Sequence, residues 1–181
     1  MSVHVNEKRV RRHRDDLTGE HTLSDAGQLV FACLFGATWI ADTFFLKYTT
    51  FLNAYVPLAV RIPLAAVLLV LSGYLARTGL SIVFGEERDR PGVIRKSVFG
   101  VVRHPIYLSE ILLYLGLLVL SISLIAAGVC LGAIVFLHYI SRYEEGLLRA
   151  RFGEDYEQYM RDVPMWVPRI GRARNANGVT S

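Results

Sequence analysis

Two long stretches of the chain, residues 26–76 and 105–140, are almost free of charged side chains. Their Asp, Glu, Lys and Arg residues are only Asp42, Lys47, Arg61 and Glu110. A helix that crosses the hydrocarbon layer of a bilayer needs about 20 apolar residues, whereas a helix of a soluble protein is seldom apolar on all sides over that length. Since 52% of all residues are hydrophobic and the mean hydropathy is +0.35, the sequence predicts an all-α integral membrane protein.

We expect about four transmembrane helices. They cover residues of about 26–46, 55–80, 105–121 and 124–140. Residues 105–140 suffice for two short helices of roughly 25 Å each, at about 1.5 Å per residue. We therefore predict a C-terminal helical hairpin with its turn near Ser121 to Ser123. Small residues let membrane helices approach closely, so Gly116, Gly128 and Gly132 are expected to bring the two hairpin helices together.

The positive charges predict the orientation in the membrane. Of the 20 Lys and Arg residues, 18 lie in residues 1–25, 77–104 and 141–181, which the four-helix arrangement puts on one side. Cytoplasmic loops carry the excess of Lys and Arg, so we expect a multi-pass protein with both termini in the cytoplasm. This topology explains the basic surplus, and we expect no nucleic-acid partner.

The first polar cluster next to the membrane is Arg103-His104-Pro105-Ile106-Tyr107. Proline is favourable at the first position of a helix, where its missing N–H would have no partner. Arg103 and His104 then present donors at a helix N-terminus, which attracts anionic groups such as a carboxylate. The alternative is an interfacial belt that only anchors the helix.

The second polar cluster, Arg142-Tyr143-Glu144-Glu145, ends the fourth predicted helix. Its adjacent carboxylates suit the binding of a cation or of ribose-type hydroxyls, although a solvated run of charges at a helix end is the alternative. Both ends of a hairpin lie at the same side of the membrane. We therefore expect His104 and Glu144 to be neighbours in a ligand pocket at the cytoplasmic rim.

The residues beyond this cluster predict a cytoplasmic amphipathic helix. Its apolar positions, spaced by one to four residues, are Leu147, Leu148, Phe152, Tyr156 and Tyr159. Gly153 is a predicted break, and Pro164 and Pro168 prevent any further helix. In the N-terminal half, Asp42 and Arg61 are expected to form a structural ion pair, because isolated charges are costly in a membrane. The two cysteines, Cys33 and Cys130, indicate neither a disulfide framework nor a metal site.

Three segments of this region are similar to a known family. They are Ser97-Val98-Phe99-Gly100-Val101-Val102-Arg103-His104-Pro105-Ile106-Tyr107, then Glu144-Glu145-Gly146-Leu147-Leu148, then Phe152-Gly153-Glu154-Asp155-Tyr156-Glu157-Gln158-Tyr159. In this order and membrane context, the chain from Val93 to Ile170 resembles the isoprenylcysteine carboxyl methyltransferase and phospholipid methyltransferase superfamily. The resemblance implies transfer of a methyl group from S-adenosyl-L-methionine to a lipophilic acceptor in the membrane, either an isoprenylcysteine-like carboxylate or a phospholipid amine.

The resemblance and the two polar clusters together suggest roles for individual residues. The residues expected to bind the cofactor are Val93, Ile94, Phe99, Arg103, His104, Pro105, Ile106, Tyr107, Glu144 and Glu145. The residues expected to act in catalysis are His104, Arg142 and Glu144. No metal is expected. The implied organisation is a cytoplasmic segment (1–25), N-terminal transmembrane helices (26–84), a cofactor-binding core that includes the hairpin (85–170) and a flexible tail (171–181).

The chain departs from the family pattern at positions that affect the acceptor. The family commonly has an arginine four residues before the first glutamate, where this chain has Ile140, while Arg142 lies two residues before it. Phe99 replaces the usual tyrosine, and Ser97 and Ser109 replace glycines. The sequence does not define the methyl acceptor or the oligomeric state. Two other functions stay open: a membrane reductase that uses NADPH, and a membrane module without catalysis.

Overall fold

The computed structural model describes residues 22–85 and 92–168, and each regular element in these ranges is helical. In chain order they are α2 (Thr22–Ile40), the π-helix η1 (Ala41–Leu46), the 3-10 helix η2 (Phe51–Ala54), α3 (Leu58–Phe84), the 3-10 helix η3 (Ser97–Gly100), α4 (Pro105–Leu120), α5 (Leu124–Phe152) and α6 (Glu154–Asp162). Most of the predicted N-terminal segment and the predicted tail 171–181 lie outside the described residues.

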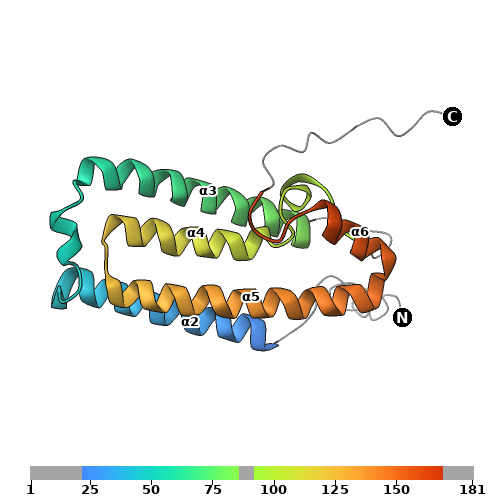
Figure 1. Ribbon diagram of the computed structural model, residues 1–181, viewed down its shortest axis with the longest axis horizontal. Helices are drawn as coiled ribbons and strands as arrows, with labels where there is room; N and C mark the ends of the chain where they lie inside the picture. The colour runs from blue at the N-terminus through green and yellow to red at the C-terminus, as the bar shows by residue number, and fades with distance from the viewer. Residues whose placement is uncertain (1–21, 86–91, 169–181) are drawn as a thin grey trace, which may run out of the picture.

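The four long helices lie along the length of the protein, and each runs antiparallel to the one before it in the chain (Figure 1). Three segments are long and apolar enough to cross a membrane, namely Ser24–Leu46, Leu58–Phe84 and Leu124–Phe152. Helix α4 is apolar but has only 16 residues, which corresponds to about 24 Å against a hydrocarbon layer of about 30 Å. The prediction of an all-α membrane protein is confirmed. Of the two hairpin helices predicted to be short, only α4 is short, because α5 has 29 residues.

The two ends of the bundle differ in what they contain (Figure 1). Helices α2 and α4 begin, and α3 and α5 end, at the end where α6 lies; we call this the site end. The far end holds η1, η2 and the turn between α4 and α5. This turn lies at Ser121–Ser123, as predicted, and Ser123 caps α5 by accepting a hydrogen bond from the N–H of Ala126 at 3.3 Å.

Helix α5 is longer than the sequence predicts. The predicted span ends near residue 140, but α5 continues through both glutamates to Phe152. Arg, Glu and Leu are favourable helix residues, and their charges do not interrupt the helix. The predicted break at Gly153 is confirmed, because this residue has φ +56° and ψ −130°, a conformation that side chains disfavour.

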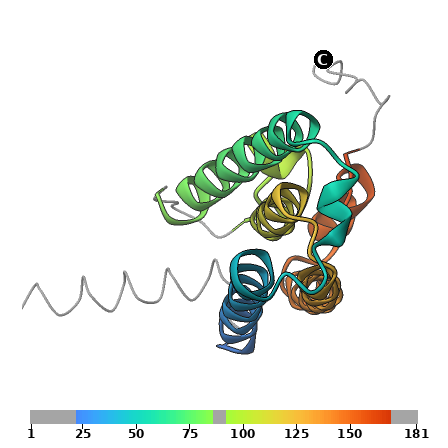
Figure 2. The same ribbon diagram turned by 90° about the vertical axis from the view of Figure 1, so that its left-hand side faces the viewer.

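The hairpin glycines do not bring α4 and α5 together. Viewed end-on, α3 pairs with α4 and α2 pairs with α5 (Figure 2). A Cβ at Gly116 would lie 2.8 Å from the side chain of Leu69 in α3, and a Cβ at Gly132 would lie 3.3 Å from Phe31 in α2, whereas Gly128 has open space. The prediction was wrong because the spacing of small residues does not identify which helix is the neighbour.

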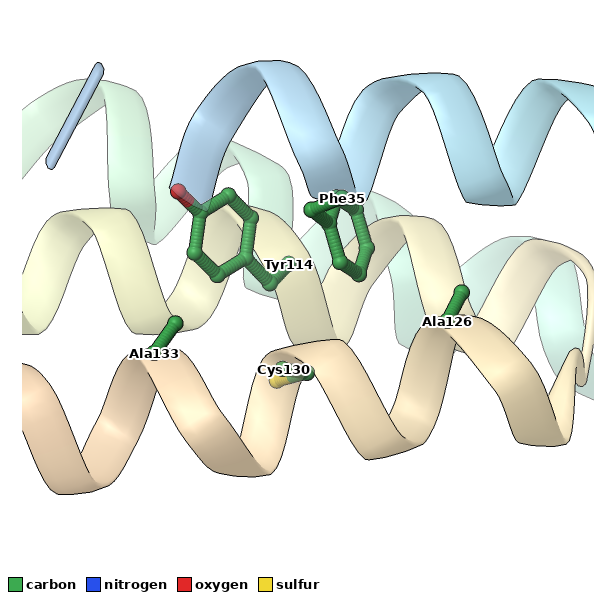
Figure 3. Close-up of a cluster of buried hydrophobic side chains, with 5 residues drawn as sticks. All are labelled: Phe35, Tyr114, Ala126, Cys130 and Ala133. Atoms are coloured by element: carbon green, nitrogen blue, oxygen red, sulfur yellow. The ribbon is translucent and has the colours of Figure 1, made fainter. Parts of the chain in front are cut away.

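A buried cluster joins α2, α4 and α5 in the middle of the bundle (Figure 3). Phe35 of α2 and Tyr114 of α4 stack with ring centroids 4.4 Å apart. The facing residues of α5 are small, namely Ala126, Cys130 and Ala133. Small side chains three or four residues apart on one helix face leave room for two aromatic rings from neighbouring helices.

Many outward-facing side chains are apolar and exposed. Examples are Val67 and Val70 of α3 and Leu131 and Val135 of α5, which are each more than 60% exposed. A water-soluble monomer rarely carries apolar patches of this kind. Contact with lipid acyl chains accounts for them.

The predicted ion pair between Asp42 and Arg61 is wrong. Asp42 accepts hydrogen bonds from Thr49 and from the hydroxyl of Ser123, and Arg61 donates to Asn53 and to a carbonyl at the end of α4. Both charged groups are buried. Their partners come from the loop between α2 and α3 and from the hairpin turn. Each charged group therefore holds this loop against the hairpin turn at the far end.

Candidate functional site

The site end gathers the predicted charged residues around the first turn of α4. Pro105 is its first residue, where the missing N–H leaves no donor unsatisfied. The backbone N–H groups of Arg103 and His104 donate to the carbonyls of Pro164 and Met165, at 2.9 and 3.3 Å. The segment after α6 therefore fixes the chain that enters α4.

A buried ion pair links the start of α4 to α5. Nε and Nη2 of Arg103 each lie 2.7 Å from Oε1 of Glu145, and the two side chains are only 8% and 2% exposed. Nη1 of Arg103 also donates to the carbonyls of Met160 and Val163. A buried ion pair is favourable only when its remaining hydrogen-bonding groups are also satisfied. The two carbonyls satisfy the remaining donors of the guanidinium. Arg103 therefore connects α4, α5 and the end of α6.

His104, Tyr107 and Glu144 form a second group of contacts in the site. Nδ1 of His104 lies 3.8 Å from Oε2 of Glu144, whose side chain is 18% exposed. The hydroxyl of Tyr107 donates to Oε1 of Glu144, and the rings of His104 and Tyr107 stack in parallel, with centroids 5.6 Å apart. The prediction that His104 and Glu144 are neighbours is confirmed, because the antiparallel hairpin returns to the site end.

Arg142 lies at the rim of this cluster. Its side chain is 62% exposed, and Nη1 is 3.6 Å from Oε2 of Glu145. Nε2 of His104 is 3.4 Å from the other oxygen of the same carboxylate. Glu145 thus has three positively charged or protonatable neighbours, Arg103, His104 and Arg142, and Arg142 is the one that solvent reaches.

The apolar residues expected at the cofactor are divided among different packing partners. Val93 packs against the cluster of Tyr156, Tyr159 and Val163, which belongs to α6 and the segment after it. Ile94 and Phe99 pack against a cluster between α3 and η3. Pro105 and Ile106 face Gly79 of α3, where an added Cβ would lie 2.9 Å from Ile106. Their contact with a cofactor stays a prediction.

Three contacts at the site end were not identified from the sequence. Ser24 of α2 has its hydroxyl 3.0 Å from that of Tyr107. The hydroxyl of Tyr159 donates to the carbonyl of Phe99 at 2.7 Å, and Arg95 pairs with Asp155 and lies over the ring of Tyr159. A contact to a backbone carbonyl cannot be recognised from residue types. Ser24 precedes the apolar run from which the first helix was predicted. These contacts therefore became visible only in the fold.

Burial also defines the protonation of the α6 tyrosines. Tyr156 and Tyr159 are both 3% exposed. Desolvation raises the pKa of each hydroxyl above its usual value of about 10. Both hydroxyls therefore keep their protons at physiological pH, and that of Tyr159 donates its proton to the carbonyl of Phe99.

The arrangement offers groups that suit a ligand with one positively charged and one negatively charged group. Glu144 is a partly exposed carboxylate, His104 and Tyr107 provide aromatic faces, and the first turn of α4 provides backbone N–H groups. Within residues 22–85 and 92–168, no cluster of three or more His, Cys, Asp or Glu side chains is arranged to hold a metal ion.

Comparison with known proteins adds one match. The profile of the phospholipid methyltransferase family matches residues 58–155, which is more than half of the chain. The matched region includes α3, α4 and α5, and thus the residues from Arg103 to Glu145; α2 lies outside it. No curated protein and no solved structure matches the chain.

Proposed function

Because the chain belongs to the phospholipid methyltransferase family, a family of membrane methyltransferases, we propose that it transfers a methyl group from S-adenosylmethionine to a lipophilic acceptor in the bilayer. One observation carries the proposal: His104 and Tyr107, at the start of α4, meet Glu144, near the end of α5. These are the residues that the family resemblance assigns to the cofactor pocket.

The residues present fit the chemistry of this cofactor. A sulfonium group is a cation, so the carboxylate of Glu144 and the stacked rings of His104 and Tyr107 are suitable partners. The amino-acid end of the cofactor carries a carboxylate, and the first N–H groups of α4 have no partners within the helix. Both kinds of group lie at the same end of the bundle.

Arg103 and Glu145 have a positioning role in this proposal. Their buried ion pair and the carbonyls bound by Arg103 hold α5 and the segment after α6 against the start of α4. The resulting frame keeps the side chains of His104 and Glu144 on one rim. Direct contact of Arg103 or Glu145 with the cofactor stays a prediction.

Methyl transfer is an in-line displacement, for which the bound cofactor supplies an electrophilic methyl group. The protein contributes mainly by aligning the acceptor with this group and by excluding water. A carboxylate acceptor needs no base. An amine acceptor must lose a proton before or during transfer, and His104 and Glu144 are then candidates for the group that takes it. Arg142, at the rim, is the predicted contact for the acceptor.

The test is isothermal titration of the full-length protein, in detergent or nanodiscs, with S-adenosylhomocysteine and separately with NADPH. We expect binding of S-adenosylhomocysteine alone. Glu144→Gln and His104→Ala should each weaken it by about tenfold or more, since hydrogen bonds to charged groups contribute about 1.5–3 kcal/mol. Glu154→Gln, a matched loss of one exposed carboxylate in α6, should leave it unchanged.

Each other outcome contradicts a defined part of the proposal. Normal affinity in both variants would place the cofactor elsewhere. Binding of NADPH in place of S-adenosylhomocysteine would support the reductase, and binding of neither would support a membrane module without catalysis.

A further inference from the structure

Helix α2 reaches the site through Ser24, a residue to which the proposed function assigns no role. The Ser24 side chain is only 3% exposed, and its hydroxyl oxygen lies 3.0 Å from the hydroxyl oxygen of Tyr107 in α4. The matched family profile begins at residue 58, so this contact comes from a helix that the profile does not include. The contribution of α2 to the site therefore has to be derived from the contacts of this chain.

The hydrogen atoms fix the direction of the contact between Ser24 and Tyr107. A tyrosine hydroxyl carries one hydrogen, and its oxygen can also accept a hydrogen bond. Tyr107 donates its hydrogen to Oε1 of Glu144 in α5. The contact at 3.0 Å is therefore made by the hydrogen of Ser24, which the Tyr107 oxygen accepts.

Gln28 extends this chain of hydrogen bonds by one turn of α2. Its side-chain amide donates to the Ser24 hydroxyl at 3.3 Å and to the Ser24 carbonyl at 3.2 Å, and an amide nitrogen has the two hydrogens that these bonds need. The donors are thus aligned from Gln28 through Ser24 and Tyr107 to the carboxylate of Glu144. Hydrogen bonds that point the same way polarise one another, so the chain strengthens its last bond, the one to the charged group.

The Tyr107 oxygen is the point where α2, α4 and α5 meet at the site end. The ring of Tyr107 also stacks on His104, with the two ring planes 5° apart. A flexible side chain that must become ordered when a ligand binds weakens binding, whereas one that the free protein already orders does not. With its hydroxyl held by Ser24, Tyr107 fixes the carboxylate of Glu144 before a ligand arrives.

Helix α2 keeps its place against α4 without the Ser24 hydroxyl. Phe35 stacks on Tyr114 with ring centroids 4.4 Å apart (Figure 3), and Nε1 of Trp39 donates to the carbonyl of Leu117 at 2.9 Å. Alanine is also a favourable helix residue. The Ser24 hydroxyl can therefore be removed without displacing α2, and its effect on the site can be measured by itself.

We propose that Ser24 is a positioning residue of this site, which acts through Tyr107 to hold the carboxylate of Glu144 where a cationic group of the ligand meets it. The inference rests on the proposed function, because that function supplies the cation, the sulfonium of S-adenosylmethionine. It gives α2, which lies outside the matched region, a part in the charge selectivity of the site. A misplaced carboxylate loses more attraction to a cation than to a neutral group, since the Coulomb energy depends on the distance between charges.

The test compares two ligands that differ in this charge. S-adenosylmethionine carries a sulfonium, whereas S-adenosylhomocysteine has the same amino-acid end and a neutral sulfur. Isothermal titration of the full-length protein in detergent gives the affinity for each. We expect Ser24→Ala to weaken binding of S-adenosylmethionine by about threefold to tenfold, the factor that corresponds to one neutral hydrogen bond, and binding of S-adenosylhomocysteine by a smaller factor.

Thr38→Ala is the matched control, because it also removes one hydroxyl from α2. The Thr38 hydroxyl donates to carbonyls of its own helix, at 2.8 and 3.1 Å, so the affinity for both ligands should stay at that of wild type. A second comparison uses Tyr107→Phe, which removes the hydroxyl through which Ser24 acts. Adding Ser24→Ala to this variant should cause no further loss, because two residues that act through one contact are not additive.

Three results would overturn the positioning role. Unchanged affinity for both ligands in Ser24→Ala would show that the hydrogen bond is not needed. An equal loss for both ligands, with a lower unfolding midpoint or without one, would show that Ser24 does not act on the charge of the site. A further loss on adding Ser24→Ala to Tyr107→Phe would mean that Ser24 acts by another route.

Wild type separates this inference from the proposed function. If wild type binds neither ligand, the proposed function fails, and the role of Ser24 fails with it. If wild type binds both ligands and Ser24→Ala behaves like wild type, only the role of Ser24 fails and the proposed function stands.

Discussion

The sharpest prediction concerns the buried ion pair between Arg103 and Glu145. Glu145→Gln removes the negative charge but keeps the shape of the side chain, and it leaves the buried guanidinium without its counter-charge, in contact with neutral acceptors. Breaking one side of a buried pair costs about 3–5 kcal/mol. Because the two side chains are only 8% and 2% exposed, solvent cannot compensate, and we expect a loss in this range.

The assay is unfolding of the protein in mixed micelles, followed by circular dichroism as the fraction of denaturing detergent rises. Arg149→Gln is the matched control. It breaks the Arg149–Glu157 pair, in which the side chains are 53% and 46% exposed and the N–O distance is 3.9 Å, and exposed pairs contribute about 0–1 kcal/mol.

One pattern of results would refute the positioning role. If Glu145→Gln destabilises the protein no more than Arg149→Gln but abolishes binding of S-adenosylhomocysteine, Glu145 contacts the ligand and does not hold the frame. A replacement of both partners by apolar residues, Arg103→Met with Glu145→Leu, should recover much of the stability lost in Glu145→Gln, because no buried charge is then left unpaired.

Three further predictions use single substitutions. Gly116→Ala should destabilise the protein by about 1–3 kcal/mol, since its Cβ would overlap an α3 side chain, whereas Gly128→Ala, in open space, should be neutral or stabilising; detergent unfolding of the two variants measures the difference. Tyr159→Phe should cost about 1–2 kcal/mol, because the carbonyl of Phe99 loses its donor, and an unchanged unfolding midpoint would contradict this contact. Arg142→Ala should change the rate or Michaelis constant for the acceptor while the affinity for S-adenosylhomocysteine stays near that of wild type, and unchanged acceptor kinetics would exclude Arg142 from the acceptor site.

The sequence was sufficient where a short-range rule controls the outcome. Apolar runs with few charges located the four long helices, Pro105 marked the start of α4, and Gly153 marked the end of α5. The meeting of His104 and Glu144 also followed, because a hairpin with one end at residue 104 must return near residue 140. Each of these depends on helix length or backbone geometry, which neighbouring residues determine.

Tertiary structure decided which surfaces meet. The sequence did not indicate that Gly116 faces α3, that Asp42 and Arg61 bind separate partners, or that Arg103 binds carbonyls after α6. A small residue requires a closely packed neighbour and a buried charge requires a polar one, but several helices and loops of this chain can provide either. The choice among them depends on how all four helices pack at once, and this is why the frame around the site became visible only in the folded protein.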